Sequence, residues 1–218
     1  MNSKMSDSEG SLPDIFDIQI EDLETSTDGH DIYDKPEEAV NRTTNDDIDE
    51  KDGQGWTKLH WAVIKDSVSE MLELLDQGGS CNVQDINGFT PLHKALECLK
   101  AEELVNKVVA LLKHGAICNI PDFNGRTPLH AALWYLERED AVQLVQEMLR
   151  FGANPSIRDG NGRTALYYAG HCSHKLEIGQ TLISNGADPS AVDKQGRTVL
   201  HGISGWQNED VIEYLAGL

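Results

Sequence analysis

The chain has 218 residues and a formal net charge of −19. The charge is uneven, because residues 1–50 hold 16 acidic and 3 basic side chains. This charge argues against direct binding of nucleic acid or anionic membranes, which are polyanions, and favours basic protein partners. No apolar run approaches the roughly 18 residues of a membrane span, and no signal-peptide pattern opens the sequence.

Residues 1–47 are expected to form an acidic, disordered tail. They are rich in Asp, Glu, Ser and Thr and poor in apolar residues. Such a segment cannot bury enough surface to offset the entropy lost on ordering. Within it, residues 12–23 interleave apolar and acidic side chains in a pattern that fits a helical face or a strand. We expect either a linear motif that folds on contact or a cover for the first repeat.

Residues 48–218 contain five copies of one phrase, in which Gly follows an Asp by three positions and Thr follows by five. Successive glycines are 33, 37, 37 and 34 residues apart, at Gly55, Gly88, Gly125, Gly162 and Gly196. This period predicts a solenoid whose units bury their faces only against their neighbours. The predicted repeats span about residues 48–81, 82–118, 119–155, 156–189 and 190–218.

Each copy predicts a turn followed by two helices. The glycine supplies a backbone conformation that other residues resist, and the threonine caps the first helix. Pro91 and Pro128 suit the first helical position, where a missing N–H costs nothing. A second, apolar helix follows in each copy, and four of these helices end at a glycine that favours a left-handed cap, at Gly78, Gly115, Gly152 and Gly186.

The phrase Gly-Phe-Thr-Pro-Leu-His at residues 88–93, with its copy at 125–130, resembles the core motif of the ankyrin repeat. The resemblance implies an all-α solenoid of helix-turn-helix units with β-turn or hairpin fingers. It implies a protein-binding module rather than an enzyme, with no cofactor. The histidines at the end of the phrase are then structural and bond backbone across the turn, at His60, His93, His130 and His201.

The cysteines indicate packing rather than chemistry. Cys81 and Cys118 hold equivalent places before the next repeat, which predicts reduced, buried thiols in a cytoplasmic or nuclear protein. The segment His171-Cys172-Ser173-His174 looks like a metal cluster, but zinc needs a second pair of ligands that the sequence does not offer. We therefore expect no metal site.

Some copies depart from the pattern. The second and third are longer by four residues, about one helical turn, which predicts longer first helices or a longer loop around residues 97–103 and 134–140. The fourth copy replaces Pro and His with Ala165 and Tyr167, and we expect it to be softer. After the fifth copy an apolar helix near the C-terminus is covered either by a partner or by a further repeat.

The resemblance places binding residues at the turn tips and on the exposed side of the first helices. Candidates of the types enriched at interface hot spots are Trp56, Phe89, Phe123, Arg126, Trp134, Tyr135, Arg163, Arg197 and Trp206. We expect the aromatic tips to be exposed, although Trp56 has an alternative in packing at the end of the first repeat. The arginine tips form a basic strip that suits an acidic partner or the chain's own acidic tail.

The leading hypothesis is a regulatory or inhibitory subunit, or an adaptor. The layout is similar to the I-kappa-B group, which also joins an acidic N-terminal region to ankyrin repeats. The segment Ser6-Asp7-Ser8-Glu9-Gly10-Ser11 resembles that group's Asp-Ser-Gly-x-x-Ser signal, with Glu9 intervening. Regulatory subunits of kinases and adaptors of ubiquitin ligases are further versions. The alternative is a structural spacer that forms part of a longer ankyrin array.

Overall fold

The computed structural model describes residues 47–65, 67–97, 104–135, 141–170, 172, 174–202 and 209–217. Over these residues the protein contains ten α-helices and no strand. The helices follow one another in five pairs: α1 (Lys58–Ile64) and α2 (Val68–Asp76), α3 (Pro91–Glu97) and α4 (Leu104–Lys113), α5 (Pro128–Tyr135) and α6 (Ala141–Arg150), α7 (Ala165–Ala169) and α8 (Lys175–Ser184), α9 (Val199–Gly202) and α10 (Glu209–Ala216). The predicted all-α solenoid is confirmed.

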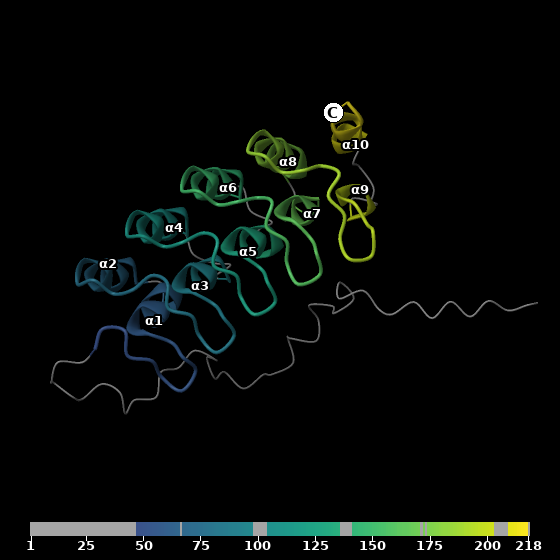
Figure 1. Cartoon of the computed structure of the whole chain (residues 1–218). Helices are drawn as coiled ribbons and strands as arrows, with labels where there is room; N and C mark the ends of the chain where they lie inside the picture. Colours follow the sequence, from purple (N-terminus) through teal and green to yellow (C-terminus); the bar gives the residue numbers. More distant parts are fainter. Residues whose placement is uncertain are drawn as a thin grey trace, which may run out of the picture. The chain divides into compact units, whose positions relative to one another are not determined.

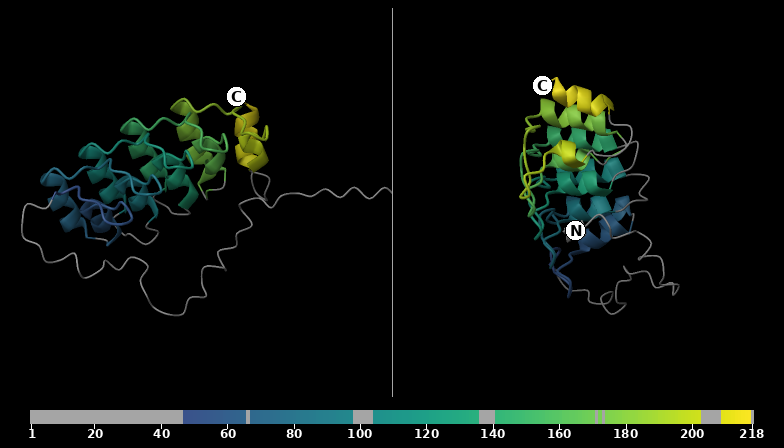
Figure 2. Two further views of the ribbon diagram at one scale, coloured as in Figure 1. Left: turned by 60° about the horizontal axis from the view of Figure 1, so that its bottom comes forward. Right: turned by 90° about the vertical axis from the view of Figure 1, so that its right-hand side faces the viewer.

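The pairs stack in two layers. Helices α1, α3, α5, α7 and α9 pack side by side in the first layer, and α2, α4, α6, α8 and α10 form the second (Figure 1). The loops that precede α3, α5, α7 and α9 lie in a row along one side of the stack, as a view along it also shows (Figure 2). The chain divides into residues 1–42 and 43–218, and every described residue belongs to the second unit.

Leucines of the repeated phrase form the core of the first layer. Leu59, Leu92, Leu129 and Leu166 are only 0–3% exposed, because each lies between its own helix pair and the next. Burial of such a side chain stabilises a fold by about 1.5–3 kcal/mol. The matching Leu200 in α9 is 46% exposed, since no described helix pair follows it.

A buried lysine joins the first two pairs. Lys107 in α4 occupies the place that Leu144 and Ile178 fill in α6 and α8, and it is 1% exposed. Its Nζ donates to the carbonyl oxygen of Val63, 3.3 Å away near the end of α1. Carbonyls at a helix C-terminus carry partial negative charge, so this position favours a cation.

The glycines adopt the conformations predicted for them. Gly125 has φ = 77°, and a Cβ atom built there would lie 2.8 Å from the backbone nitrogen of Gly160. Glycine at this position therefore allows both the turn and the close approach of the next loop. Gly115, after α4, has φ = 90° with no atom near a built Cβ, so it is present for its conformation alone.

Three of the four cysteines lie in the described residues. Cys81, Cys118 and Cys172 are buried free thiols, which the sequence predicted for Cys81 and Cys118. Burial raises the pKa of Cys81 and of Cys118 to about 11, which keeps both thiols protonated. The Cys81 thiol donates to the carbonyl oxygen of His114, 3.5 Å away, so it packs and bonds within the stack.

Several predictions concern residues outside the described ranges. These residues are the tail up to Asp46, the inserted segments 98–103 and 136–140, and His171 and Ser173 of the possible metal cluster. The longer first helices and the disordered tail therefore stay predictions. No described helix combines the length and apolar character needed to cross a membrane.

Candidate protein-binding surface

Five turns of nearly identical geometry line one side of the stack. We call them fingers 1 to 5: Asp52–Thr57, Asp85–Thr90, Asp122–Thr127, Asp159–Thr164 and Asp193–Thr198. In each finger the aspartate Oδ1 accepts the N–H groups two and four positions later, at 2.8–2.9 Å. The aspartate N–H donates to the carbonyl before the threonine at 2.8–2.9 Å. This closed set of bonds fixes the backbone of every finger.

Neighbouring fingers are joined by one backbone hydrogen bond each. Across the first two junctions, Ile86 N–H donates to Gln54 O and Phe123 N–H donates to Asn87 O, both at 3.1 Å. Across the next two, the N–H groups of Gly160 and Lys194 donate to Asn124 O and Asn161 O. The fingers therefore form a continuous row whose spacing is set by backbone contacts.

Histidines couple each helix start to the next finger. In finger 2, His93 Nδ1 accepts the N–H of Thr90 at 3.2 Å, so the ring proton must reside on Nε2. Nε2 then donates to the carbonyl of Arg126 in finger 3, 3.2 Å away. His60 and His130 make the matching bonds to Phe89 and Arg163. The structural role predicted for these histidines is confirmed.

Burial keeps these rings neutral. It lowers the pKa of His60 and His130, and it lowers that of His93 to about 4, because a charged imidazole inside the stack would lose its water. His201 in α9 receives the N–H of Thr198 on Nδ1 in the same way, at 3.0 Å, but its side chain is exposed.

The second aspartate oxygen accepts donors that vary among the fingers, with the equivalent arginine serving fingers 3 and 5. In the outer fingers, Asp52 Oδ2 accepts Trp61 Nε1 at 2.9 Å, and Asp193 Oδ2 accepts Arg197 Nε at 2.9 Å. In the inner fingers the donors are Trp56 Nε1 to Asp85, Arg126 Nε to Asp122 and the Tyr168 hydroxyl to Asp159. The turn is therefore constant, and the side chains around it vary.

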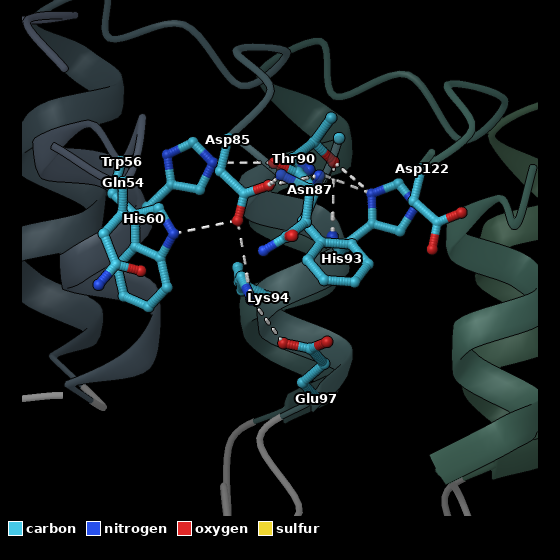
Figure 3. A network of polar contacts seen from close by, with 12 residues as sticks. Gln54, Trp56, His60, Asp85, Asn87, Thr90, His93, Lys94, Glu97 and Asp122 are labelled. Carbon is cyan, nitrogen blue, oxygen red and sulfur yellow. Dashed lines mark hydrogen bonds and ion pairs between the residues drawn. The ribbon is translucent and has the colours of Figure 1, made fainter. Parts of the chain in front are cut away.

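A charged cluster lies between the first two pairs (Figure 3). Lys94 Nζ is 2.9 Å from Glu97 Oε2 and 3.9 Å from Asp85 Oδ2, and it also lies over the rings of Trp56 and Phe89 at 5.1 and 4.4 Å. Side chains from α3 and from fingers 1 and 2 thus surround one cation. The cation compensates two carboxylates that are largely removed from water.

Comparison with known families identifies the fold. The family model named Ankyrin repeats (3 copies) matches residues 32–110 and 136–218. The chain belongs to the ankyrin-repeat family. Ankyrin repeats form protein–protein interaction modules, so a protein is the expected class of partner. Among curated proteins no significant match was found.

The ankyrin fingers do not expose every predicted tip residue. Trp56 is 7% exposed: its ring packs against Trp61 at 4.6 Å and its Nε1 donates to Asp85 at 3.0 Å. Arg163 is 6% exposed, and its guanidinium stacks on the ring of Tyr167 at 4.8 Å. The expected exposure of Trp56 is wrong, because its ring packs on Trp61 of α1 and its Nε1 donates to Asp85 of the next finger.

The other predicted residues vary in exposure. Phe123 stands at the tip of finger 3 and is 74% exposed. Phe89, Arg126 and Arg197 are partly buried beside their own fingers, and Trp134 packs against Tyr168 at 5.6 Å on the first-helix layer. Tyr135 closes α5, but its side chain lies outside the described structure, as does all of Trp206.

Sequence reasoning missed Ile86. It occupies the position directly after the aspartate of finger 2, the same place that Phe123 holds in finger 3, and it is 58% exposed. Aligning the five fingers by their aspartates would have found it, because the residues at this position are Gly53, Ile86, Phe123, Gly160 and Lys194. The apolar tip is therefore shared by two adjacent fingers.

Acid is expected to destabilise the stack through its buried histidines. The pKa of His93 is 6.5 in the unfolded chain and about 4 in the folded protein, so the unfolded state binds a proton at a higher pH. The stabilisation from His93 is complete above pH 6.5 and falls by about 1.4 kcal/mol per pH unit toward pH 4. Urea unfolding at about pH 7.5 and about pH 5 measures the loss.

Two variants separate this effect from general damage. His93→Gln should reduce the pH dependence by the share of one histidine. Leu92→Ala, at an adjacent and equally buried position, should lower stability by the same amount at both pH values. A His93→Gln protein that keeps the full pH dependence of the natural chain would contradict the assignment.

The Lys94 cluster predicts coupled mutational effects. Lys94→Met keeps the apolar stem but removes the cation from between Asp85 and Glu97, so we expect a loss of roughly 1–3 kcal/mol in unfolding free energy. Adding Glu97→Gln should recover part of that loss, since one uncompensated carboxylate is gone. Urea unfolding of both single variants and the double variant tests this, and strictly additive effects would refute the shared role of Lys94.

Proposed function

We propose that the chain is a non-catalytic regulatory or inhibitory subunit, or an adaptor, that binds a protein partner through its finger tips and first-helix face. Five copies of the phrase and five helix pairs support a count of five ankyrin repeats. Such a module acts by covering part of its partner or by holding it beside another protein. A layout similar to the I-kappa-B group and a cytoplasmic or nuclear location belong to this proposal.

The observation that carries the proposal is the exposure of Phe123. Phe123 is 74% exposed, on a turn whose backbone is held by hydrogen bonds on both sides. An aromatic side chain in this position adds little to the packing of its own fold. Rigid, exposed aromatics are the residues that dominate binding energy in protein interfaces.

The candidate residues divide into two roles. Those that offer surface to a partner are Phe89, Phe123, Arg126, Trp134 and Arg197, with Tyr135 and Trp206 retained as predictions. Trp56 and Arg163 are buried between fingers, and we assign them to holding the surface in shape. In this assignment a partner contacts the exposed residues, and Trp56 and Arg163 hold the fingers that carry them.

The partner is proposed to be basic. The net charge of −19 favours attraction of a cationic protein. The arginine strip does not oppose this, because Arg126 is paired with Asp122 at 2.8 Å and Arg197 with Asp193 at 2.9 Å. The same pairing weakens the case for the acidic tail as an intramolecular lid on the arginines.

A structural spacer is the second candidate. It is favoured by the last described pair, which exposes Leu200 and Ile212 at 46% and 49%. In a longer array those side chains would be covered by another repeat. The molecular mass in solution distinguishes the two functions. A protein that stays monomeric at high concentration argues against an exposed apolar end that needs another repeat, and so against the spacer.

The proposed surface predicts which variants lose the partner. We expect Trp134→Ala/Tyr135→Ala to lose the main partner when the protein is affinity-purified from its native cell. Phe151→Ala is the control, because Phe151 is an exposed aromatic at the end of α6, away from the fingers. Retention of the partner by the double variant would move the site elsewhere.

The lid hypothesis is tested with the same purified partner. If the tail covers the fingers, a chain without residues 1–47 should bind that partner more tightly, because the competitor is removed. Unchanged or weaker binding would dismiss the lid and leave the binding surface itself in place.

A further inference from the structure

Ile86 and Phe123 form an isolated apolar ridge on the finger row. At 58% and 74% they are the most exposed large apolar side chains of the described residues. Gly53 and Gly160 hold the same position in the fingers on either side, so no side chain borders the ridge there. A partner segment can approach the backbone closely on both flanks of the ridge.

The ridge contributes little to the stability of its own fingers. Ile86 and Phe123 donate their backbone N–H groups to the preceding finger, at 3.1 Å in both cases, and these bonds do not depend on the side chain. The side chains project from turns that the aspartates hold internally. Their removal is therefore expected to leave the fold intact.

Charge changes sign along the finger row. In finger 1 and the five residues before it, the exposed charged side chains are Asp47, Glu50, Lys51 and Asp52, and Lys51 Nζ donates to Gln84 O at 3.0 Å. In fingers 4 and 5 and the five residues before each, the exposed charged side chains are Arg158, Lys194 and Asp188, and Arg158 donates to Val192 O as Lys51 does to Gln84 O. The row thus runs from an acidic end, over the apolar ridge, to a basic end.

The length of the row indicates the length of a matching segment. Packed helices lie about 8–10 Å apart, so five fingers span roughly 32–40 Å. An extended chain advances about 3.3 Å per residue, which corresponds to roughly 10–12 residues. A segment of this length can therefore place charged side chains against the fingers at both ends of the row.

We propose that the finger row holds an extended partner segment of about 12 residues that is basic at one end, apolar in the middle and acidic at the other. Its basic end lies at finger 1, its apolar side chains pack on Ile86 and Phe123, and its acidic end lies at finger 5. The inference rests on the proposed protein-binding function and names the partner's chemistry.

Selection from random dodecapeptides displayed on phage, with the full chain as bait, tests the inference. The enriched peptides should share lysine or arginine near one end, apolar residues in the middle and acidic residues near the other. A synthetic enriched peptide carrying fluorescein is then titrated against each variant. Ile86→Ser/Phe123→Ser should weaken binding by about tenfold or more, as loss of a hot spot does.

Matched controls separate the ridge from other surfaces. Ile117→Ser removes an apolar side chain of similar exposure from the loop after α4 and should leave binding unchanged. Lys194→Glu should weaken the binding of peptides with an acidic end and leave unchanged the binding of peptides in which that end is replaced by serine. Thermal unfolding of Ile86→Ser/Phe123→Ser should match that of the natural chain.

Each other outcome decides the question differently. If the selected peptides bind Ile86→Ser/Phe123→Ser as tightly as the natural chain but lose affinity for Trp134→Ala, the protein-binding function stands and the ridge proposal fails. Enriched peptides without the charge pattern also overturn it. If no peptide is enriched, the segment proposal is rejected, and loss of the cellular partner by Trp134→Ala/Tyr135→Ala still decides the broader function.

Discussion

In three successive repeats, the proton on histidine Nε2 links the start of a helix to the following finger. Because a backbone N–H donates to Nδ1 of His60, His93 and His130, each ring must carry its own proton on Nε2. That proton is donated to a carbonyl of the next finger. One side chain therefore fixes the start of its helix and the position of the following finger. The arrangement requires a neutral ring, which burial provides.

The finger aspartates separate constant structure from variable surface. One oxygen always closes the turn, whereas the other accepts a tryptophan in fingers 1 and 2, an arginine in fingers 3 and 5, and a tyrosine in finger 4. A carboxylate with two oxygens can do both at once. The fold thus tolerates different large side chains around its fingers without any change in the backbone. Some of these variable side chains bond within the stack, and only those that stay exposed can contact a partner.

The repeated letters predicted the fold because their roles are local. Gly125 needs its φ of 77° to form its own turn, and the bond from Thr90 N–H to His93 Nδ1 lies within the phrase itself. Exposure was not predictable in the same way. Trp56 meets Asp85 across 29 residues, so its burial depends on what the next finger offers as an acceptor. Arg163 is likewise buried against Tyr167 in α7, at a position where Arg126 and Arg197 stay partly exposed.

Different residue positions of each repeat determine folding stability and partner binding. The buried leucines and the histidine bonds occur in successive pairs, so changing one of them weakens a junction wherever it lies. In fingers 2 to 5 the residue after the aspartate donates its backbone N–H to the preceding finger, and its side chain ranges from none at Gly160 to the exposed ring of Phe123. At Ile86 and Phe123 this bond does not depend on the side chain, so sequence change there alters the surface without a large cost in folding free energy. A Cβ atom at Gly160, in contrast, would lie 2.6 Å from Asn124 O, so a side chain there requires the backbone to shift. A binding ridge on two fingers, with glycine on both sides, is the kind of local difference that such a scaffold permits.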